Sequence, residues 1–143
     1  MIYQKNKGDW FISTDKSKLD ITVINTYLAN AYWAIGRSEN AILRSIEGSM
    51  CFGMYHQNQQ VGFARAMTDK ATFAYMVDVF ILPKHQGNGL GKWLVETILS
   101  HPELQNINWL LKTKDAHGLY AQFGFTVLTD ADLLMHRLAH QPY

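Results

Sequence analysis

A long apolar run between Thr72 and Leu82 limits the fold more than any other part of the sequence. Successive side chains of a β-strand point to opposite faces of a sheet. If the run is one strand, one face carries Phe73, Tyr75, Val77, Val79 and Ile81, and the other carries Ala74, Met76, Asp78, Phe80 and Leu82. Because both sets are almost wholly apolar, both faces have to be covered. We therefore expect a central strand in a sheet that has helices on each side.

Four other segments have the apolar spacing of helices. Ser17–Asp20 resembles a capping box, so a helix is expected to begin at this serine. Ser38 can cap a second helix, which Gly48 would close. Two further helices are expected over Leu90–Leu99 and Ala116–Phe123.

Several shorter segments are rich in apolar and aromatic residues and are expected to be strands. They are Trp10–Ser13, Met50–His56, Gln60–Met67, Asn108–Lys112, Phe125–Leu128 and Leu133–Leu138. The turn at Gln57–Gln59 would join two of them into a hairpin, in which Asn58 can take a positive φ.

The expected order of elements is β-α-α-β-β-β-α-β-α-β-β. Antiparallel hairpins in the first half and a crossover unit in the second indicate an α/β fold with a mixed, mostly antiparallel sheet and helices on both faces. The chain has 143 residues, 48% of them hydrophobic, and shows no repeat or linker. These properties suit one domain over residues 1–143.

The charge balance argues against several kinds of partner. A formal net charge of +1 gives no electrostatic attraction to nucleic acid or to an anionic membrane surface. No stretch approaches the roughly 18 apolar residues of a membrane span, and the N-terminus lacks an apolar signal segment, so we expect a cytoplasmic protein. Cys51 lies in an apolar run and is expected to be a buried, inert thiol. No cluster of His, Cys and Asp has metal-binding spacing, so no metal is expected.

The apolar run is followed by Pro83 and then by a glycine-rich turn that leads into the expected helix at Leu90. A strand, a glycine turn and a helix N-terminus bring backbone N–H groups together, and this arrangement binds phosphate. The spacing disagrees with two common phosphate motifs. A Walker A loop would need a hydroxyl residue where Trp93 stands. A dinucleotide-binding motif that begins at Gly87 would need a glycine where Lys92 stands.

A third motif does fit the turn. Gln86–Gly91 resembles Q/R-x-x-G-x-G/A, the pyrophosphate-binding motif of the GNAT N-acetyltransferase superfamily. Upstream, Asp78–Pro83 is similar to the central strand of that superfamily, which ends in proline. Downstream, Ala116–Phe125 is similar to its second motif, A-x-x-L-Y-x-x-x-G-F. The likeness covers about residues 50–128, and it implies a GNAT-type fold with acetyl-CoA as the acyl donor.

The resemblance also implies which residues bind acetyl-CoA. Residues 86–92, here called the glycine loop, would hold the pyrophosphate through Gln86, Gly87, Asn88, Gly89, Leu90, Gly91 and Lys92. Glycines let the backbone approach closely, and the helix dipole favours an anion. The pantetheine arm would pair with the end of the central strand at Phe80, Ile81 and Leu82. Many relatives have an arginine at the position of Gln86. The amide side chain of Gln86 carries no charge.

Two residues are candidates for proton transfer. Tyr120 matches the tyrosine that protonates the leaving thiolate in many superfamily members; the alternative is that its ring only packs in the core or on the donor. Asp78 lies among apolar neighbours, where an unpaired charge is costly. It either pairs with Arg65 on the preceding strand or acts as the base for the acceptor amine. Some relatives use a chain of waters and have no dedicated base.

The resemblance places acceptor recognition near the first helix and the loop after it. There Trp33 can stack on an amine, and Arg37 can bind a carboxylate; the alternative is that Trp33 packs on the helix and Arg37 makes a surface or interhelix contact. We therefore expect an N-acyltransferase that moves acetyl from acetyl-CoA to a primary amine of a small molecule or peptide, by direct attack in a ternary complex. A homodimer is compatible with the resemblance. The alternative is a non-catalytic CoA-binding module with the same fold.

Overall fold

The computed structural model describes residues 1–139 and forms a six-stranded sheet in the order β1-β2-β3-β4-β5-β6. The strands are β1 Gln4–Lys7, β2 Trp10–Ser13, β3 Met50–His56, β4 Gln59–Thr68, β5 Phe73–Ile81 and β6 Asn108–Leu111. Neighbouring strands are antiparallel except β5 and β6, which are parallel. The expectation of a mixed, mostly antiparallel sheet is therefore confirmed.

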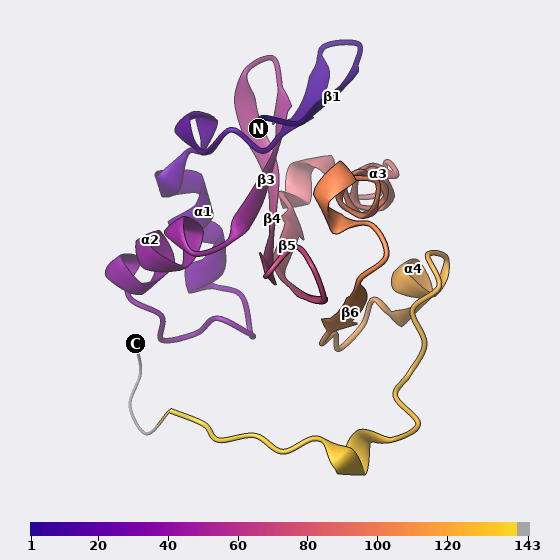
Figure 1. The fold of residues 1–143 in the computed structure, drawn as a ribbon. Coiled ribbons are helices and arrows are strands. Elements are labelled where there is room, and N and C mark those ends of the chain that lie inside the picture. The colour runs from indigo at the N-terminus through magenta and orange to yellow at the C-terminus, as the bar shows by residue number, and fades with distance from the viewer. Residues whose placement is uncertain (140–143) are drawn as a thin grey trace.

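Helices cover both faces of this sheet (Figure 1). They are α1 Ile21–Ala29, α2 Glu39–Glu47, α3 Leu90–Leu99 and α4 His117–Ala121. In Figure 1, α1 and α2 lie on one side of β3, β4 and β5, and α3 lies on the other. The central strand is thus covered from both sides, as its apolar run predicts.

The first two helices begin at oxygen-bearing side chains that accept backbone hydrogen bonds. Ser38 caps α2, as predicted. The prediction that Ser17 caps the first helix was wrong, because Ser17 lies in a short 3-10 turn. Asp20 caps α1 instead and accepts a hydrogen bond of 3.2 Å from the backbone of Val23. The side chain of Gln60 accepts from the N–H of Asp20 at 2.7 Å and ties the start of α1 to β4.

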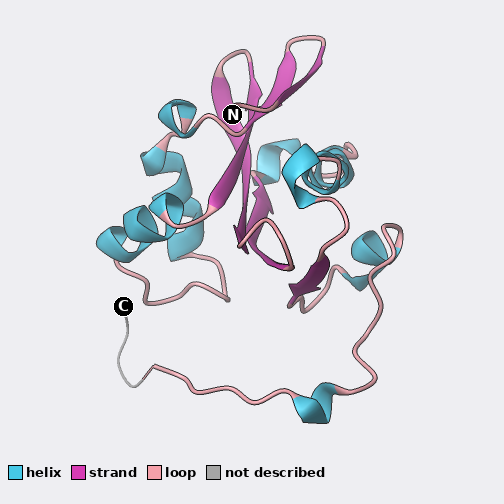
Figure 2. Ribbon diagram, viewed as in Figure 1, coloured by secondary structure: helices cyan, strands magenta, loops and turns pink. Residues whose placement is uncertain are grey.

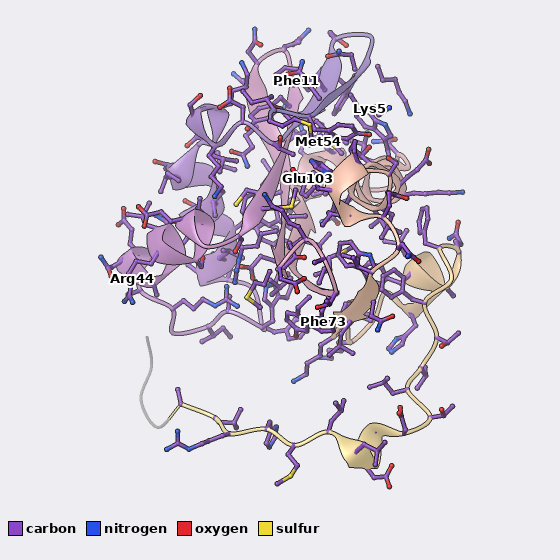
Figure 3. The ribbon with its side chains drawn as sticks, viewed as in Figure 1. Lys5, Phe11, Arg44, Met54, Phe73 and Glu103 are labelled. Carbon is purple, nitrogen blue, oxygen red and sulfur yellow. The ribbon has the colours of Figure 1, made fainter. Side chains whose placement is uncertain are left out.

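Two apolar clusters fill the space between the sheet and its helices. The cluster under α3 includes Met54 and Leu94, both fully buried. The cluster under α1 and α2 includes Ile24 and Phe63. In Figure 3, Met54 lies near the centre of the molecule, whereas Arg44 points outward from α2. Each fully buried side chain of this size stabilises the fold by about 1.5–3 kcal/mol, so the sheet is held from both faces.

A β-bulge interrupts β5 at Asp78. Phe63 of β4 lies opposite Phe80, whereas Arg65 lies opposite Val77, so β5 has two residues where β4 has one. Asp78 has a φ of 56°, in the left-handed region that Asp tolerates better than most residues. This is the geometry of a bulge whose first residue is left-handed.

The bulge changes which side chains share a face of β5. Before it, Met76 packs in the cluster under α3; after it, Val79 and Ile81 pack in that same cluster. Phe80 packs in the opposite cluster, under α1 and α2. The two alternating sets that the sequence predicts for Thr72–Leu82 are therefore wrong beyond Val77, because the extra residue shifts the alternation by one position.

The structure differs from the expected order of elements at both ends of the chain. β1 was not predicted, because Gln4–Lys7 is polar and exposed and carries no apolar alternation. The two closing strands predicted at Phe125–Leu128 and Leu133–Leu138 are wrong. That part of the chain is extended loop with a short 3-10 turn at Ala131–Leu133 (Figure 2).

Candidate active site

β5 and β6 separate after a short stretch of pairing. The parallel ladder begins with Phe73 opposite Asn108 and ends with Met76 opposite Leu111. β5 continues to Ile81, so among residues 1–139 the second half of β5 has no strand beside it on this edge. Backbone groups on such an edge are open to a ligand that carries its own amide groups.

The bulge holds a buried network of charged side chains. The Asp78 carboxylate, with 1% of its side chain exposed, accepts from Arg65 Nε at 2.7 Å and from Trp33 Nε1 at 2.8 Å. Arg37 Nη1 lies 2.7 and 2.9 Å from its two oxygens. Arg65 also donates to the Ser49 hydroxyl at 2.8 Å. The predicted pairing of Asp78 with Arg65 is confirmed.

Both residues that are predicted to bind the acceptor belong to this network. Trp33 and Arg37 follow α1 in the chain, and the polar end of each side chain is directed at Asp78. Each carboxylate oxygen of Asp78 already accepts from two donors. Contact of Trp33 or Arg37 with an acceptor, and a role of Asp78 as a base, stay predictions.

The glycine loop presents free backbone N–H groups in front of α3. Within residues 1–139, no backbone N–H of residues 87–92 donates to another group. Gly87 and Gly89 have φ values of 84° and 75°, and a Cβ at either position would have no atom within 4 Å. The turn therefore requires glycine for its backbone conformation and not for space. Free N–H groups at a helix N-terminus form an anion-binding site.

The side chain of Gln86 attaches the glycine loop to the end of β5. Its Nε2 donates to the carbonyl of Ile81 at 2.9 Å. The N–H of Leu82 donates to the carbonyl of Val61 at 2.8 Å, which keeps the strand end fixed to β4. Ile81, Leu82 and Gln86, all predicted to bind the donor, therefore lie together.

Tyr120 lies on α4, close to the start of α3. Leu119 Cδ2 is 4.0 Å from the position that a Cβ on Gly91 would occupy. The Tyr120 side chain is buried, and its ring meets Phe125 edge-on with centroids 5.7 Å apart. Burial, and to a smaller extent Tyr32, raises the pKa of Tyr120 to about 12. The hydroxyl therefore keeps its proton at neutral pH and can serve as a proton donor.

Sequence reasoning missed a contact that joins the segment after α1 to the loop before α4. The N–H of Lys114 donates to the Tyr32 hydroxyl at 3.1 Å, and Lys114 Nζ lies 5.5 Å from the centre of the same ring. No local pattern links the two residues, because they are 82 positions apart. The contact brings the Trp33 segment and the Tyr120 segment to the same side of the molecule.

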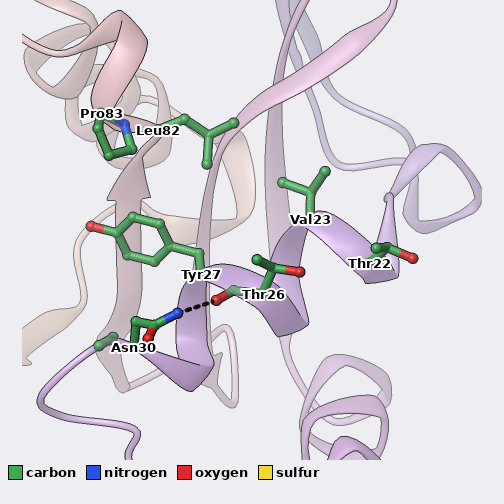
Figure 4. Close-up of a pocket in the computed structure, with 8 residues that line it drawn as sticks. Thr22, Val23, Thr26, Tyr27, Asn30, Leu82 and Pro83 are labelled. Atoms are coloured by element: carbon green, nitrogen blue, oxygen red, sulfur yellow. Dashed lines mark hydrogen bonds between the residues drawn. The ribbon is translucent and has the colours of Figure 1, made fainter.

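A pocket of about 510 Å³ lies between α1 and the end of β5 (Figure 4). It is lined by Thr22, Val23, Thr26, Tyr27, Asn30, Ala31, Leu82 and Pro83. The Tyr27 ring stacks on Phe80 with centroids 4.0 Å apart. Asn30 donates to the Thr26 carbonyl at 3.1 Å, the dashed line in Figure 4. No charged side chain lines the pocket. The sequence did not predict Tyr27 as a site residue.

Cys51 is buried, as predicted, and burial raises the pKa of its thiol to about 11. Among residues 1–139, no group of three or more His, Cys, Asp or Glu side chains could hold a metal ion. In the same range, every helix is too short or too polar to cross a membrane.

The sequence has clear relatives. Residues 47–127, more than half of the chain, match the family model of the acetyltransferase (GNAT) domain. A protein of Gibberella zeae that is named as an acetyltransferase is 33% identical in an alignment 140 positions long, which covers 81% of this chain and 78% of that protein.

Solved structures agree with these matches. A GNAT-family acetyltransferase from Xanthomonas campestris pv. campestris has a TM-score of 0.88 and 42% identity, over 94% of this chain and 96% of that chain. A GNAT acetyltransferase from Elizabethkingia anophelis with acetyl-CoA bound has a TM-score of 0.65 and 15% identity, over 85% and 79% of the two chains. The second likeness concerns the fold alone.

Proposed function

Because the chain belongs to the GNAT acetyltransferase family, we propose that it transfers the acetyl group of acetyl-CoA to a primary amine. One observation carries this proposal: the free N–H groups of the glycine loop and the buried Tyr120 hydroxyl lie on adjoining elements. The N–H groups suit the pyrophosphate of the donor. The hydroxyl suits proton transfer to a leaving thiolate.

Donor binding involves three parts of the chain in this proposal. The N–H groups of residues 87–92 bind the pyrophosphate. The open edge of β5 at residues 79–81 pairs with the amides of the pantetheine arm. Two exposed lysines, Lys84 just before the glycine loop and Lys92 at its end, supply the positive charge that Gln86 lacks. The hydrogen bond from Gln86 to Ile81 keeps these parts in register.

The reaction forms an amide and releases a thiol, and acetyl-CoA supplies the activated thioester. Open N–H groups at the end of β5 polarise the carbonyl oxygen as the amine nitrogen bonds to the carbonyl carbon. Tyr120 gives its proton to the sulfur as the carbon–sulfur bond breaks. The proton that the amine loses passes to water and so to solvent, which finally returns a proton to Tyr120.

Asp78 acts as a positioning residue in this scheme. Its carboxylate stabilises the bulge in β5 and, by accepting hydrogen bonds, fixes Trp33 and Arg37 against the sheet. A bulge turns the backbone locally, so the network sets which N–H groups face the open edge. The number of donors already bound to its two oxygens supports this role over that of a base.

The pocket between α1 and β5 is our proposed acceptor site. It borders Leu82 and Pro83 at the end of the strand that would carry the donor. Its lining is apolar apart from hydroxyl and amide groups. Such a lining favours an amine whose body is apolar or aromatic, because a highly charged acceptor would lose hydration there without gaining a partner.

The replacement Tyr120→Phe tests the proposal. It removes the proton donor and keeps the ring in the core, so we expect kcat to fall about 100-fold, with the KM for acetyl-CoA little changed. The assay follows the release of free thiol across classes of amine acceptors. Tyr3→Phe is the matched control, because the Tyr3 hydroxyl is exposed and contacts only Ser100 and so lies outside the candidate site.

An unchanged kcat in Tyr120→Phe would exclude Tyr120 as the acid. If the native protein binds acetyl-CoA in calorimetry but releases no thiol with any class of amine, the alternative of a CoA-binding module without catalysis is correct. If it does not bind acetyl-CoA at all, the donor site that we propose is wrong.

A further inference from the structure

The last part of the chain that the structure describes is an apolar segment without a partner on the described body of the molecule. This C-terminal arm, residues 126–139, follows α4 and runs apart from the sheet (Figures 1 and 2). Its large apolar side chains are strongly exposed: Val127, Leu128, Leu133, Leu134, Met135 and Leu138. Met135 has 98% of its surface exposed. Contiguous exposure on this scale marks a surface that is covered by another molecule.

The arm is fixed where it leaves the body and then makes hydrogen bonds only with itself. The N–H of Phe125 donates to the carbonyl of Tyr120, and Gly124 turns the chain with a φ of 87°. Beyond this point, the hydrogen bonds of the described arm residues are those of the short turn at Ala131–Leu133. The arm therefore leaves the body in a set direction and does not fold back on its own sheet.

The same chain carries an unprotected sheet edge. β6 is the last strand of the sheet, and its residues Trp109, Leu110 and Leu111 are only half buried. The N–H of Asn108 donates inward to Thr72. Strand alternation then turns the N–H groups of Trp109 and Leu111 outward. An exposed apolar edge strand is a template for pairing with another strand.

Charges on the arm complement those near this edge. Asp130 and Asp132 lie on the arm, and Lys112 and Lys114 directly follow β6; all four side chains are exposed. The start of the arm carries Thr126, Val127 and Thr129, which are β-branched and favour a strand. The arm thus matches the β6 edge in charge, and its first residues suit pairing as a strand.

We propose that two copies of this chain exchange their C-terminal arms, each arm pairing with the β6 edge of the other copy. The contact is reciprocal, as a two-fold axis requires, and closes both exposed edges at once. It also covers the apolar side chains of both arms. Phe125 touches Tyr120 at the base of the arm, so each arm leaves its own body beside α4.

Mass measurement by light scattering tests this proposal on the full-length protein. We expect a dimer of about twice the 16.4 kDa chain mass at micromolar concentrations. The double variant L133D/L134D should be a monomer, because the charges oppose burial of the arm. Leu43→Asp is the matched control: it adds a charge at an exposed leucine of α2 and should leave the dimer intact. Circular dichroism checks that each variant keeps its fold.

A mixing experiment identifies the partner surface. Leu111→Pro removes one outward N–H from the β6 edge and leaves the arm unchanged. This variant and L133D/L134D should each be monomeric alone. Mixed in equal amounts, they should form a heterodimer in native mass spectrometry, because one keeps a usable arm and the other a usable edge.

Three results would overturn the proposal. A monomeric native protein excludes a second copy as the partner of the arm. A dimer that survives L133D/L134D, or one that Leu43→Asp abolishes, places the interface elsewhere. Failure of the two folded variants to combine excludes pairing between the arm and the β6 edge.

Discussion

Asp78 shows how one residue can shape both the core and the candidate site. Its backbone is left-handed at a bulge, and its carboxylate accepts hydrogen bonds from two arginines and a tryptophan. Burying two guanidinium groups near one another is costly unless an anion lies between them. The carboxylate therefore joins β4, β5 and the segment after α1 by charge, at a place where the ladder hydrogen bonds are disrupted.

The replacement Asp78→Asn should destabilise the protein while keeping the bulge. Asparagine tolerates a positive φ and has nearly the same shape, so the change isolates the loss of charge. We expect the free energy of unfolding to fall by about 3 kcal/mol, because Arg65 is left buried, and Arg37 partly buried, without an anion. Urea unfolding measures the loss. Asp115→Asn, at an exposed carboxylate, is the control and should change stability little. If Asp78→Asn lowers the free energy of unfolding no more than Asp115→Asn does, the network contributes no stability.

Burial of acidic groups predicts how stability depends on pH. Burial raises the pKa of Cys51 from its ordinary value of 9.0 to about 11. Above the ordinary value, the unfolded chain loses this proton and the folded chain keeps it, so the unfolded state binds fewer protons. The free energy of unfolding should then decline between about pH 9 and pH 11, by at most about 1.4 kcal/mol per pH unit for this group.

Urea unfolding across this range checks the effect of Cys51. The Cys51→Ala variant should show a shallower decline than the native protein, because the titrating group is gone. Tyr120, whose pKa burial raises from 10.0 to about 12, adds its own decline between about pH 10 and pH 12 in both proteins. Parallel curves for the two proteins between pH 9 and pH 11 would contradict the assignment to Cys51.

At the scale of elements, two glycines of the glycine loop are needed for different reasons: Gly87 for the backbone conformation and Gly91 for ligand binding. Gly87 has a positive φ, so Gly87→Ala should destabilise the free protein by roughly 1–2 kcal/mol. Gly91 lies in the first turn of α3 and would tolerate a Cβ, whose nearest neighbour is an ordinary 4.0 Å contact. Gly91→Ala should therefore raise the free energy of unfolding by about 0.5–1 kcal/mol.

The same Gly91→Ala variant should bind acetyl-CoA more weakly, at least several-fold in calorimetry, because a Cβ interferes with close approach of the pyrophosphate to the loop. Opposite changes in stability and affinity are the signature of a residue kept for its ligand. If affinity is unchanged, the backbone at Gly91 does not lie against the donor.

The elements that sequence patterns predicted well are those whose signals are local. α3 spans Leu90–Leu99 as expected, and the β3–β4 hairpin turns at Gln57 and Asn58, both with positive φ. Hydrophobic periodicity and turn residues determine these elements almost alone. The bulge at Asp78 left no such signal, because its cause is a network with Arg65 and residues after α1 that are distant in the chain.

The same limit explains which parts of the candidate site could be predicted. The glycine loop and Tyr120 belong to short motifs, and the structure brings their elements together. Tyr27 and the contact of Tyr32 with Lys114 depend on how α1 packs on the sheet, which no motif encodes. The C-terminal arm shows the converse: its apolar segments predict strands, but a strand also needs a partner, and the described arm pairs with no strand of its own body.

At the scale of the whole molecule, the candidate site lies where separately stabilised parts meet. One core cluster holds α3 and α4 against the sheet, and the other holds α1 and α2. Between them, the second half of β5 has an open edge. A donor that binds the glycine loop, this edge and α4 would therefore link parts that otherwise touch mainly through the sheet.

This arrangement predicts strong stabilisation by the donor. A ligand that binds only the folded state adds about 2.7 kcal/mol at a concentration of 100 times its Kd. For a chain of this length that corresponds to a rise in Tm of roughly 5–10 °C, measurable by differential scanning calorimetry with acetyl-CoA. Gly91→Ala should show a smaller rise at the same acetyl-CoA concentration, because its donor site is impaired.

Fragments of the donor separate the contributions of its parts. ADP carries the pyrophosphate without the arm, and pantetheine carries the arm without the pyrophosphate. If the glycine loop and the β5 edge form one site, each fragment should raise Tm less than acetyl-CoA does, and Gly91→Ala should reduce only the ADP effect. A loss of the pantetheine effect in Gly91→Ala would instead mean that the loop and the strand edge do not bind separate parts of the donor.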